Sequence, residues 1–432
     1  MVTKGLIVTT VLTTLIVSGC SERTDKSTSS VETVKEVPEP VKLTLYQRGA
    51  NISDEEFRAL IAEPVQKKYP YITVELVRST QDASPVSLLS GGSLPDLLFA
   101  NPGTLREIKE LKAVEDLTEL VRSTRFDLSR FESYTIDAIR TNGGDPNKLY
   151  GIPFSVNFSV LYYNKDIFDK FGEAYPVDGM TWDEVTSLAR KVTRSENGQP
   201  YYGLHPADVD RMAGQLSIGA YDPNTRKATL TSEGWLRVFA ANKAVWDIQG
   251  NQPGNNITAF MKDRNLAMMP QLGARLGELE DLHKQGVPLN WDMVSYPTFP
   301  EAPQTGSETD VHTLSITSTS KHKEAAFKVI EVVSEDATQL EKTRRGRQSG
   351  LKDPKYKESF GSGLQTLQGK HVAAIFQIIP AKPRFSDKYS DIAKNQIATA
   401  MNKVIKGEAD INSALREAEE LANKQIEAAI NK

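Results

Sequence analysis

Apolar and polar positions follow two different periods in the part of the chain that begins at Val41. Val41 to Tyr46, Ile72 to Val77 and Asp96 to Ala100 are short apolar or β-branched runs that predict strands. Asp54 to Tyr69, between the first two, places its apolar side chains on one face of a helix. Because strands alternate with helices at this spacing, the pattern predicts βαβ units and a mainly parallel sheet that is covered by helices on both faces.

From Tyr150 the pattern changes to a pair of short strands and then to helices. The two strands are predicted at Gly151 to Pro153 and at Ser159 to Asn164. Thr181 and Glu184 have the spacing of a capping box, which predicts the start of a long helix. Further amphipathic helices are predicted at Thr231 to Ile248, Lys321 to Val333, Asp391 to Ile405 and Ile411 to Ile430.

The N-terminal segment has the pattern of a secretion signal followed by a tether. Lys4 precedes an apolar run from Leu6 to Val17, which is shorter than the roughly 20 residues needed to cross a bilayer. We therefore predict a signal peptide over residues 1–19. Residues 21–40 are rich in Ser, Thr, Glu and Lys and contain no aromatic residue, so a flexible tether is predicted there.

Length and composition narrow the class of protein. The chain has 432 residues, and the part after the tether is longer than one hydrophobic core usually supports, so two lobes are predicted. The net charge of -4 and the scattered basic residues argue against a nucleic-acid partner. Cys20 is the only cysteine, so the chain cannot form an internal disulfide.

The residues Val17-Ser18-Gly19-Cys20 resemble the lipobox of bacterial lipoproteins. This resemblance implies that Cys20 is lipidated and becomes the first residue, with residues 20–40 holding a globular body outside the cytoplasm on a membrane. It favours the cell surface of a Gram-positive bacterium over a periplasm. The alternative is an ordinary signal peptide that ends by chance in a cysteine.

Several segments, taken in order, resemble the extracellular solute-binding proteins of ABC importers, specifically the family that serves sugars (family 1). The segment from Leu161 to Asp166, with its Tyr-Asn-Lys-Asp run, is the most specific of them. The resemblance covers nearly all of the chain after Leu43. The other segments that carry it are Gly92 to Phe99, Tyr150 to Phe154, Thr181 to Glu184, Ala267 to Met269, Tyr296 to Pro300 and Ser320 to Ala326.

The resemblance implies an α/β fold of the periplasmic-binding-protein-like type II, with two lobes, each a mainly parallel sheet flanked by helices, and a cleft between them. Lobe one is expected to comprise residues 41–156 and 314–370, and lobe two residues 157–313 and 371–432. Hinges are expected near Phe154 to Phe158 and Asp310 to Leu314, with a third crossing around Lys370 to Ile379.

The resemblance also implies a carbohydrate ligand, most simply an oligosaccharide, held by planar donors and acceptors and by aromatic faces. The segment from Pro270 to Arg275 has no tryptophan, where maltose-type relatives present an aromatic platform; Phe385, Phe158 or Trp291 would stack instead. The arginines suit an acidic or sulfated glycan equally well. The candidate ligand-binding residues are Arg48, Asn51, Asn101, Asn157, Phe158, His205, Asp208, Arg211, Gln271, Arg275, Arg384 and Phe385.

Other chemistry is weakly indicated. His205, Asp208 and Asp210 lack the spacing of zinc or calcium ligands, and Trp235 and Trp246 fit packing better than sugar stacking, so we expect no metal and no cofactor. The hydrolase elbow and His-Glu-x-x-His motifs are absent. We therefore expect a monomeric binding protein, not an enzyme, with permease subunits as partners. A surface glycoside hydrolase and a ligand-sensing lipoprotein that reports to a membrane kinase are the alternatives.

Overall fold

The computed structural model describes residues 38–80 and 84–431. Residues Pro40–Lys432 form one compact unit. The predicted signal peptide, the lipidation site at Cys20 and most of the predicted tether lie outside the described residues. No helix in the described part of the chain is both long and apolar enough to cross a membrane.

Lobe one, as we use the term, is built on a sheet with the strand order β2-β1-β3-β13-β4. β1 (Val41–Arg48) pairs in parallel with β2 (Ile72–Arg78) and with β3 (Leu97–Ala100). β13 (Asp310–Ile316) runs antiparallel to both of its neighbours, β3 and β4 (Ile152–Asn157). The parallel strand–helix–strand units predicted from the first segments are thus confirmed.

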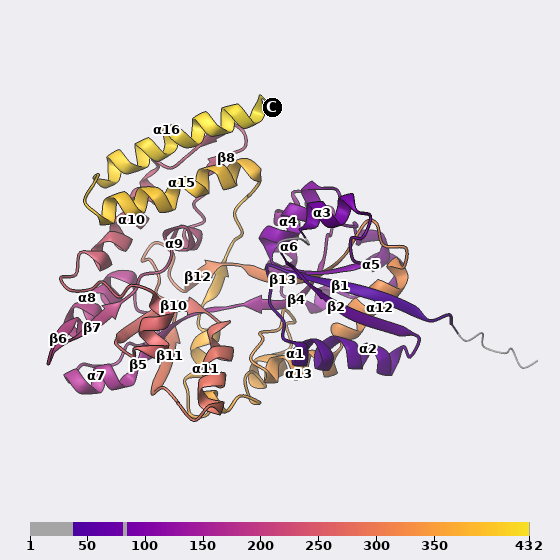
Figure 1. Cartoon of the computed structure of the whole chain (residues 1–432), viewed down its shortest axis with the longest axis horizontal. Helices are drawn as coiled ribbons and strands as arrows, with labels where there is room; N and C mark the ends of the chain where they lie inside the picture. The colour runs from indigo at the N-terminus through magenta and orange to yellow at the C-terminus, as the bar shows by residue number, and fades with distance from the viewer. Residues whose placement is uncertain (1–37, 81–83, 432) are drawn as a thin grey trace, which may run out of the picture. The chain divides into compact units, whose positions relative to one another are not determined.

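Helices cover both faces of this sheet, with α4 and α6 on one side and α1 and α2 on the other (Figure 1). The predicted helix from Asp54 to Tyr69 is present as three consecutive pieces, α1 (Asp54–Phe57), a π-helical turn (Arg58–Ala62) and α2 (Glu63–Lys68). The other helices of lobe one are α3 (Pro85–Ser90), α4 (Pro102–Glu110), α5 (Thr118–Thr124), η2 (Leu128–Arg130), α6 (Ser133–Gly143), α12 (Lys323–Val333), α13 (Asp336–Arg344) and α14 (Pro354–Glu358).

Lobe two is built on a second sheet with the order β11-β5-β10-β7-β6. Only β10 and β7 pair in parallel; the other neighbours are antiparallel. This sheet is therefore more mixed than the strand–helix pattern predicts, because β6 and β7 form a tight hairpin and β5 enters directly from the other lobe. Its strands are β5 (Ser159–Asn164), β6 (Arg194–Glu196), β7 (Gln199–Leu204), β10 (Leu266–Leu272) and β11 (Trp291–Ser295).

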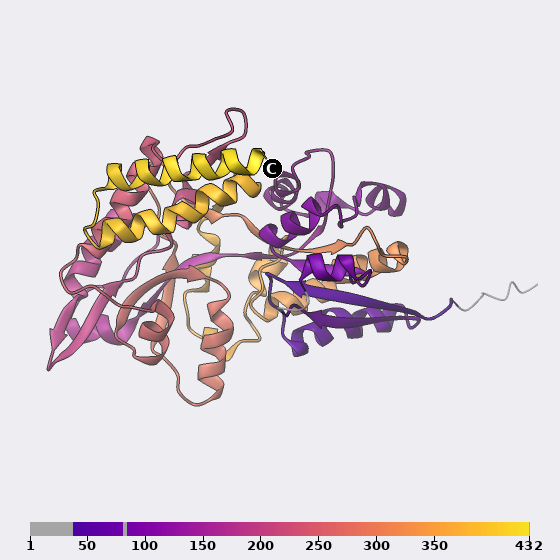
Figure 2. The ribbon, with the colours of Figure 1, turned by 45° about the horizontal axis from the view of Figure 1, so that its top comes forward.

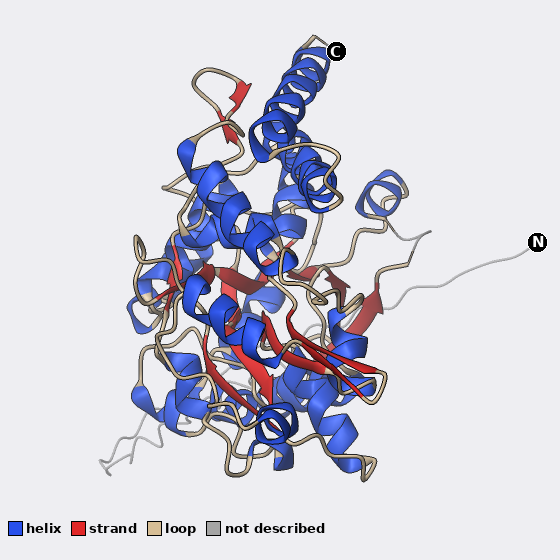
Figure 3. Cartoon of the chain, turned by 90° about the vertical axis from the view of Figure 1, so that its left-hand side faces the viewer, coloured by secondary structure: helices blue, strands red, loops and turns tan. Residues whose placement is uncertain are grey.

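The predicted helices of lobe two are present, and they lie outside the strands (Figure 3). The capping box of Thr181 and Glu184 opens α8 as predicted. The last two helices lie side by side and antiparallel (Figure 2). The helical segments are α7 (Lys165–Phe171), α8 (Trp182–Val192), α9 (Val209–Gln215), α10 (Glu233–Trp246), η3 (Thr258–Lys262), α11 (Arg275–Lys284), η4 (Gln365–Leu367), η5 (Val372–Phe376), α15 (Lys388–Ile405) and α16 (Ile411–Ile430).

Two small sheets complete the fold. β8 (Tyr221–Asp222) pairs with β9 (Lys227–Ala228). β12 (Thr305–Glu308) pairs with β14 (Ile379–Ala381) just before the chain enters β13.

The strands predicted as a pair at Gly151 to Pro153 and Ser159 to Asn164 are instead β4 and β5, which belong to different sheets. Only Phe158 separates them, and one residue is too short for a hairpin turn, so the extended chain passes straight from one lobe to the other. This crossing lies within the region expected as a hinge.

The other two crossings differ from the expected boundaries. The expected boundary at 313/314 falls inside β13, all of which belongs to the sheet of lobe one. The third crossing comes before Phe360, since Phe360 packs edge-to-face on Phe158 at 5.5 Å and Leu367 lies in the same core of lobe two. Residues 360–370 therefore pack with lobe two, because their apolar side chains fill that core.

Candidate functional site

In each sheet, strands end close to a chain crossing. In lobe one, Arg48 at the end of β1 is in register with Ala100 at the end of β3. In lobe two, Leu272 at the end of β10 is in register with Ser159, the first residue after the crossing. Ligands of open α/β sheets bind outside the carboxyl ends of the strands. The residues that follow these strands are therefore the candidates for binding.

A cavity of about 650 Å³, here the lobe-one cavity, lies at the ends of β1 and β3. The Arg48 guanidinium lines it and donates to both carboxylate oxygens of Glu107, at 3.2 and 3.1 Å. Asn101 lines it too, and its side chain caps α4 by accepting from the Thr104 amide at 2.9 Å. Both predicted residues are thus present, but each already has a partner within lobe one.

Gly49 allows the end of β1 to lie close to the first turn of α4. Its φ is +72°, and a Cβ at this position would lie 2.5 Å from Asn101 Oδ1 and 2.3 Å from Thr104 Oγ1. A side chain here would collide with the cap of α4, so glycine allows the end of β1 to approach it.

Asn51 and Asn157 lie outside both cavities described here. Asn51 is exposed and accepts from Gln47 Nε2 at 2.7 Å. Asn157, at the first crossing, donates to Asp310 Oδ2 at 3.1 Å and so joins the end of β4 to the start of β13.

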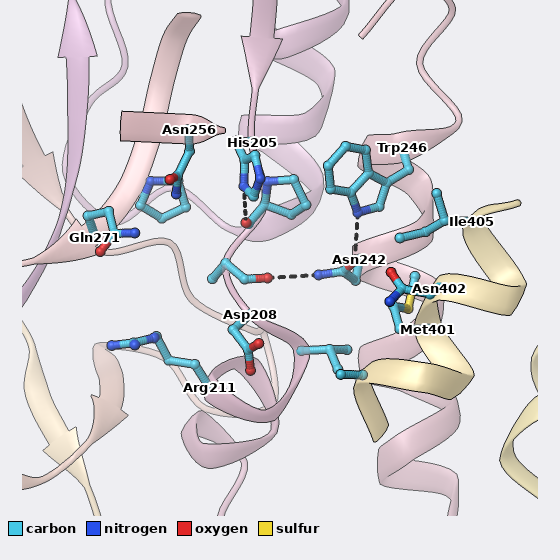
Figure 4. A pocket seen from close by; sticks show the side chains of 15 residues that line it. His205, Asp208, Arg211, Asn242, Trp246, Asn256, Gln271, Met401, Asn402 and Ile405 are labelled. Carbon is cyan, nitrogen blue, oxygen red and sulfur yellow. Dashed lines mark hydrogen bonds between the residues drawn. The ribbon is translucent and has the colours of Figure 1, made fainter. Parts of the chain in front are cut away.

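A second cavity of about 270 Å³, here the lobe-two cavity, brings together four of the predicted residues, His205, Asp208, Arg211 and Gln271 (Figure 4). His205 follows β7 and Gln271 lies near the end of β10, which are the two parallel neighbours of this sheet. Asp208 caps α9 by accepting from the Asp210 amide at 3.0 Å. No ion pair of Arg211 is found among the described residues, so its donors face the cavity without a carboxylate partner.

His205 is held in one orientation. Its Nδ1 lies 2.8 Å from the Pro206 carbonyl oxygen, and its ring packs edge-to-face on Trp246 at 5.2 Å. Burial lowers the pKa of His205 below its ordinary value of 6.5, so the neutral imidazole is favoured. A neutral ring can present one nitrogen to a ligand hydroxyl.

Sequence reasoning missed most of the other residues that line this cavity. Trp246 is one: it ends α10 and donates its indole N–H to Asn242 Oδ1 at 3.0 Å, whereas Trp235 on the same helix is fully buried. The position of Trp246 at the very end of a helix could have indicated its exposure. The cavity is completed by Asn242, Asn256 and, from α15, Ala398, Met401, Asn402 and Ile405.

Besides Asn51 and Asn157, four further candidate ligand-binding residues lie in neither cavity. Phe158 is buried in the core of lobe two, and Arg275 is paired with Glu278 at 2.5 Å. Phe385 is 42% exposed and therefore still presents an aromatic surface, whereas Trp291 is 1% exposed and presents none.

Arg384 is the fourth, and its guanidinium is enclosed by protein. It donates to Glu308 Oε2 at 2.9 Å and to Asp210 Oδ1 at 2.8 Å, and its side chain is 5% exposed. These contacts join β12, α9 and the segment before α15, which is a structural role.

The metal alternative considered from the sequence involves His205, Asp208 and Asp210. These side chains are directed to separate partners, the Pro206 carbonyl, the α9 cap and Arg384. Within the described residues, no group of three or more His, Cys, Asp or Glu side chains could hold a metal ion.

One ion pair spans the two lobes. Arg106 Nη2 on α4 donates to both carboxylate oxygens of Asp391 on α15, at 2.9 and 2.7 Å. Both residues line the lobe-one cavity, so this contact closes one side of it with an element of lobe two.

Comparison with protein families places most of this chain in one of them. Residues 50–340 match the family described as bacterial extracellular solute-binding protein. An arabinooligosaccharide-binding protein of Bacillus subtilis is 28% identical over 235 residues, which cover 51% of this chain and 49% of that protein. A mannitol-binding protein of Pseudomonas aeruginosa is 29% identical over 117 residues, covering 27% and 23%. The chain thus matches about half the length, or less, of these curated relatives.

Solved structures share the fold over nearly the whole chain. An ABC substrate-binding protein of Listeria monocytogenes in complex with cycloalternan superposes with a TM-score of 0.72 and 20% identity, covering 90% of this chain and 99% of that one. The sugar-binding protein MalE of Xanthomonas citri has a TM-score of 0.69 and 17% identity, covering 90% and 98%. The two-lobe type II fold is therefore confirmed.

Proposed function

This chain belongs to the family of bacterial extracellular solute-binding proteins, and from that membership we propose that it captures a neutral oligosaccharide between its lobes and delivers it to the permease subunits of an ABC importer. A ligand that contacts both lobes only in the closed form shifts the population toward that form. Capture of this kind needs no chemical change in the ligand, no cofactor and no metal.

The observation that carries the proposal is that each lobe presents polar side chains in a cavity at the ends of its strands. Asn101 and Arg48 line the lobe-one cavity, and His205, Asp208 and Gln271 line the lobe-two cavity. Amides, a neutral imidazole and a carboxylate are donors and acceptors that suit hydroxyl groups. The names of relatives support a carbohydrate, since two are arabinooligosaccharide-binding proteins and one similar structure holds mannotriose.

Ion pairing favours a neutral glycan over an acidic or sulfated one. Arg48, Arg106 and Arg275 each pair with a carboxylate, and Arg384 pairs with two. An acidic ligand would have to displace these partners and leave carboxylates unpaired near its own charge. Arg211 is the one candidate arginine without an ion pair among the described residues, and a single guanidinium also serves as a hydroxyl donor.

The same proposal includes the location of the protein in the cell. Lipidation of Cys20 would hold a monomeric chain on the outer face of the cell membrane, with residues 20–40 as its tether, most simply in a Gram-positive bacterium. At this location the protein would bind its solute before it docks on the permease.

Titration calorimetry of the full-length protein, purified in detergent, tests the function. The probes are arabino-, manno- and malto-oligosaccharides and, as the acidic comparison, oligogalacturonate. We expect a neutral series to bind and to be recovered intact; a ligand at 100 times its Kd adds about 2.7 kcal/mol to the free energy of unfolding. Arg211→Ala should weaken binding by about tenfold, whereas Arg122→Ala, an exposed change on α5, should not.

Three results would contradict the proposal. Cleaved sugar products would indicate a glycoside hydrolase. Tight binding of oligogalacturonate alone would indicate an acidic ligand. Equal affinities of Arg211→Ala and the unaltered protein would exclude Arg211 from the site.

A further inference from the structure

One face of α15 connects the two cavities. Asp391 lines the lobe-one cavity, while Ala398, Asn402 and Ile405 line the lobe-two cavity. Positions 391, 395, 398, 402 and 405 follow the spacing of four and three residues that places side chains in one row along a helix. The row begins beside lobe one, at the Arg106 contact, and runs across lobe two (Figure 1).

This row is distinct from the face that holds α15 in the fold. Ala393, Ile397, Ala400 and Val404 are buried in the core of lobe two. Asn395, Ala398 and Asn402 are exposed, and within the described part of the chain neither asparagine has a hydrogen-bond partner for its side chain. From Asp391 to Asn402 the helix rises about 16 Å, at 1.5 Å per residue.

The chemistry of the row suits a neutral, extended ligand. Asn395 and Asn402 each offer two donors and an acceptor for hydroxyl groups. Ala398 between them is small enough to leave room for a sugar ring. The one charged member, Asp391, is already neutralised by Arg106.

We propose that this row of α15 is the wall of an elongated binding groove, in which an oligosaccharide begins in the lobe-two cavity, passes over Ala398 and Asn395 and ends at the Arg106–Asp391 pair. The inference rests on the proposed function. It specifies where the oligosaccharide lies and which residues make the affinity depend on its length. Asn402 would contact every ligand, and Asn395 only those that extend beyond the lobe-two cavity.

Calorimetry of the full-length protein with a series from monosaccharide to hexasaccharide, taken from the neutral family that binds, tests the groove. Ala398→Leu should weaken binding of the longer members by about tenfold, and leucine keeps the helix because its helix propensity is high. Asn395→Ala should leave the shortest ligands unchanged and weaken the longer ones from a definite chain length upward.

The matched controls lie on α16, where Asn412 and Ala428 are exposed and line neither cavity. Asn412→Ala and Ala428→Leu should not change any affinity. The melting temperature of each variant shows whether it is folded.

The outcomes separate this groove from the function on which it depends. If the unaltered protein binds no saccharide, the proposed function fails and the groove with it. If it binds oligosaccharides but Ala398→Leu and Asn395→Ala bind every length unchanged, the function stands and the groove is wrong. An unaltered protein that binds only a monosaccharide also overturns the groove.

Discussion

At the scale of single residues, burial and pairing decide whether a polar side chain is available to a ligand or holds the fold together. His205 is packed on Trp246 at the rim of the lobe-two cavity, and burial lowers its pKa. Arg384 is enclosed by two carboxylates, while Arg211 faces the cavity without one. The residue types that suit a sugar were visible in the sequence, but partners and exposure, which decide between binding and structure, were not.

The lowered pKa of His205 predicts a loss of stability in acid. The unfolded chain takes up a proton near pH 6.5, whereas the folded protein resists it, so the free energy of unfolding falls as pH decreases below that value. The slope is at most about 1.4 kcal/mol per pH unit for one proton. His205→Asn should show a shallower slope between pH 7 and 5 in urea unfolding. A residual slope of the free energy of unfolding against pH is expected in His205→Asn, since burial also lowers the pKa of His312.

Parallel slopes for the unaltered protein and His205→Asn would contradict the prediction.

At the scale of elements, the site depends on how short segments are joined. Arg384 links β12, α9 and the segment that leads into α15, through Glu308 and Asp210. The capping box of Asp387 and Ser390 begins α15 immediately afterwards. The direction of α15, and with it the row of side chains proposed as a groove wall, therefore depends on a buried ion pair.

Removal of Arg384 should destabilise the fold more than it changes the site. Arg384→Ala leaves two carboxylates without their cation and should lower the free energy of unfolding by about 3 kcal/mol, measured by urea denaturation. The neighbouring Lys382→Ala is the control, because Lys382 is exposed. If Arg384→Ala instead left the stability unchanged and weakened sugar binding, Arg384 would be a ligand-binding residue.

At the scale of the whole compact unit, the lobes are joined by three chain crossings and by the Arg106–Asp391 pair. The crossings follow from the order of the strands in two sheets. The ion pair does not constrain the chain in that way, and it can break when the lobes separate. It therefore contributes to the balance between open and closed forms.

Breaking this pair should favour the open form of the empty protein. Arg106→Ala and Asp391→Ala should each increase the radius of gyration measured by X-ray scattering, and the double variant should increase it no further. A partly exposed pair of this kind is worth about 0.2–1 kcal/mol, so sugar affinity should change by no more than about fivefold. Arg122→Ala removes an ion pair within α5 and should have no effect. Identical scattering of the unaltered protein, the two single variants and the double variant would exclude a role in closure.

The sequence by itself determined the local elements, because apolar period and caps are properties of neighbouring residues. The helix from Ile411 to Ile430 and the capping box at Thr181 are found where they were predicted. Only the tertiary structure decided that β4 and β5 enter different sheets, that Arg384 is buried against Asp210 and Glu308, and that Ala398 shares a cavity with His205. These facts depend on contacts between residues far apart in the chain, and no local pattern of hydrophobicity records them.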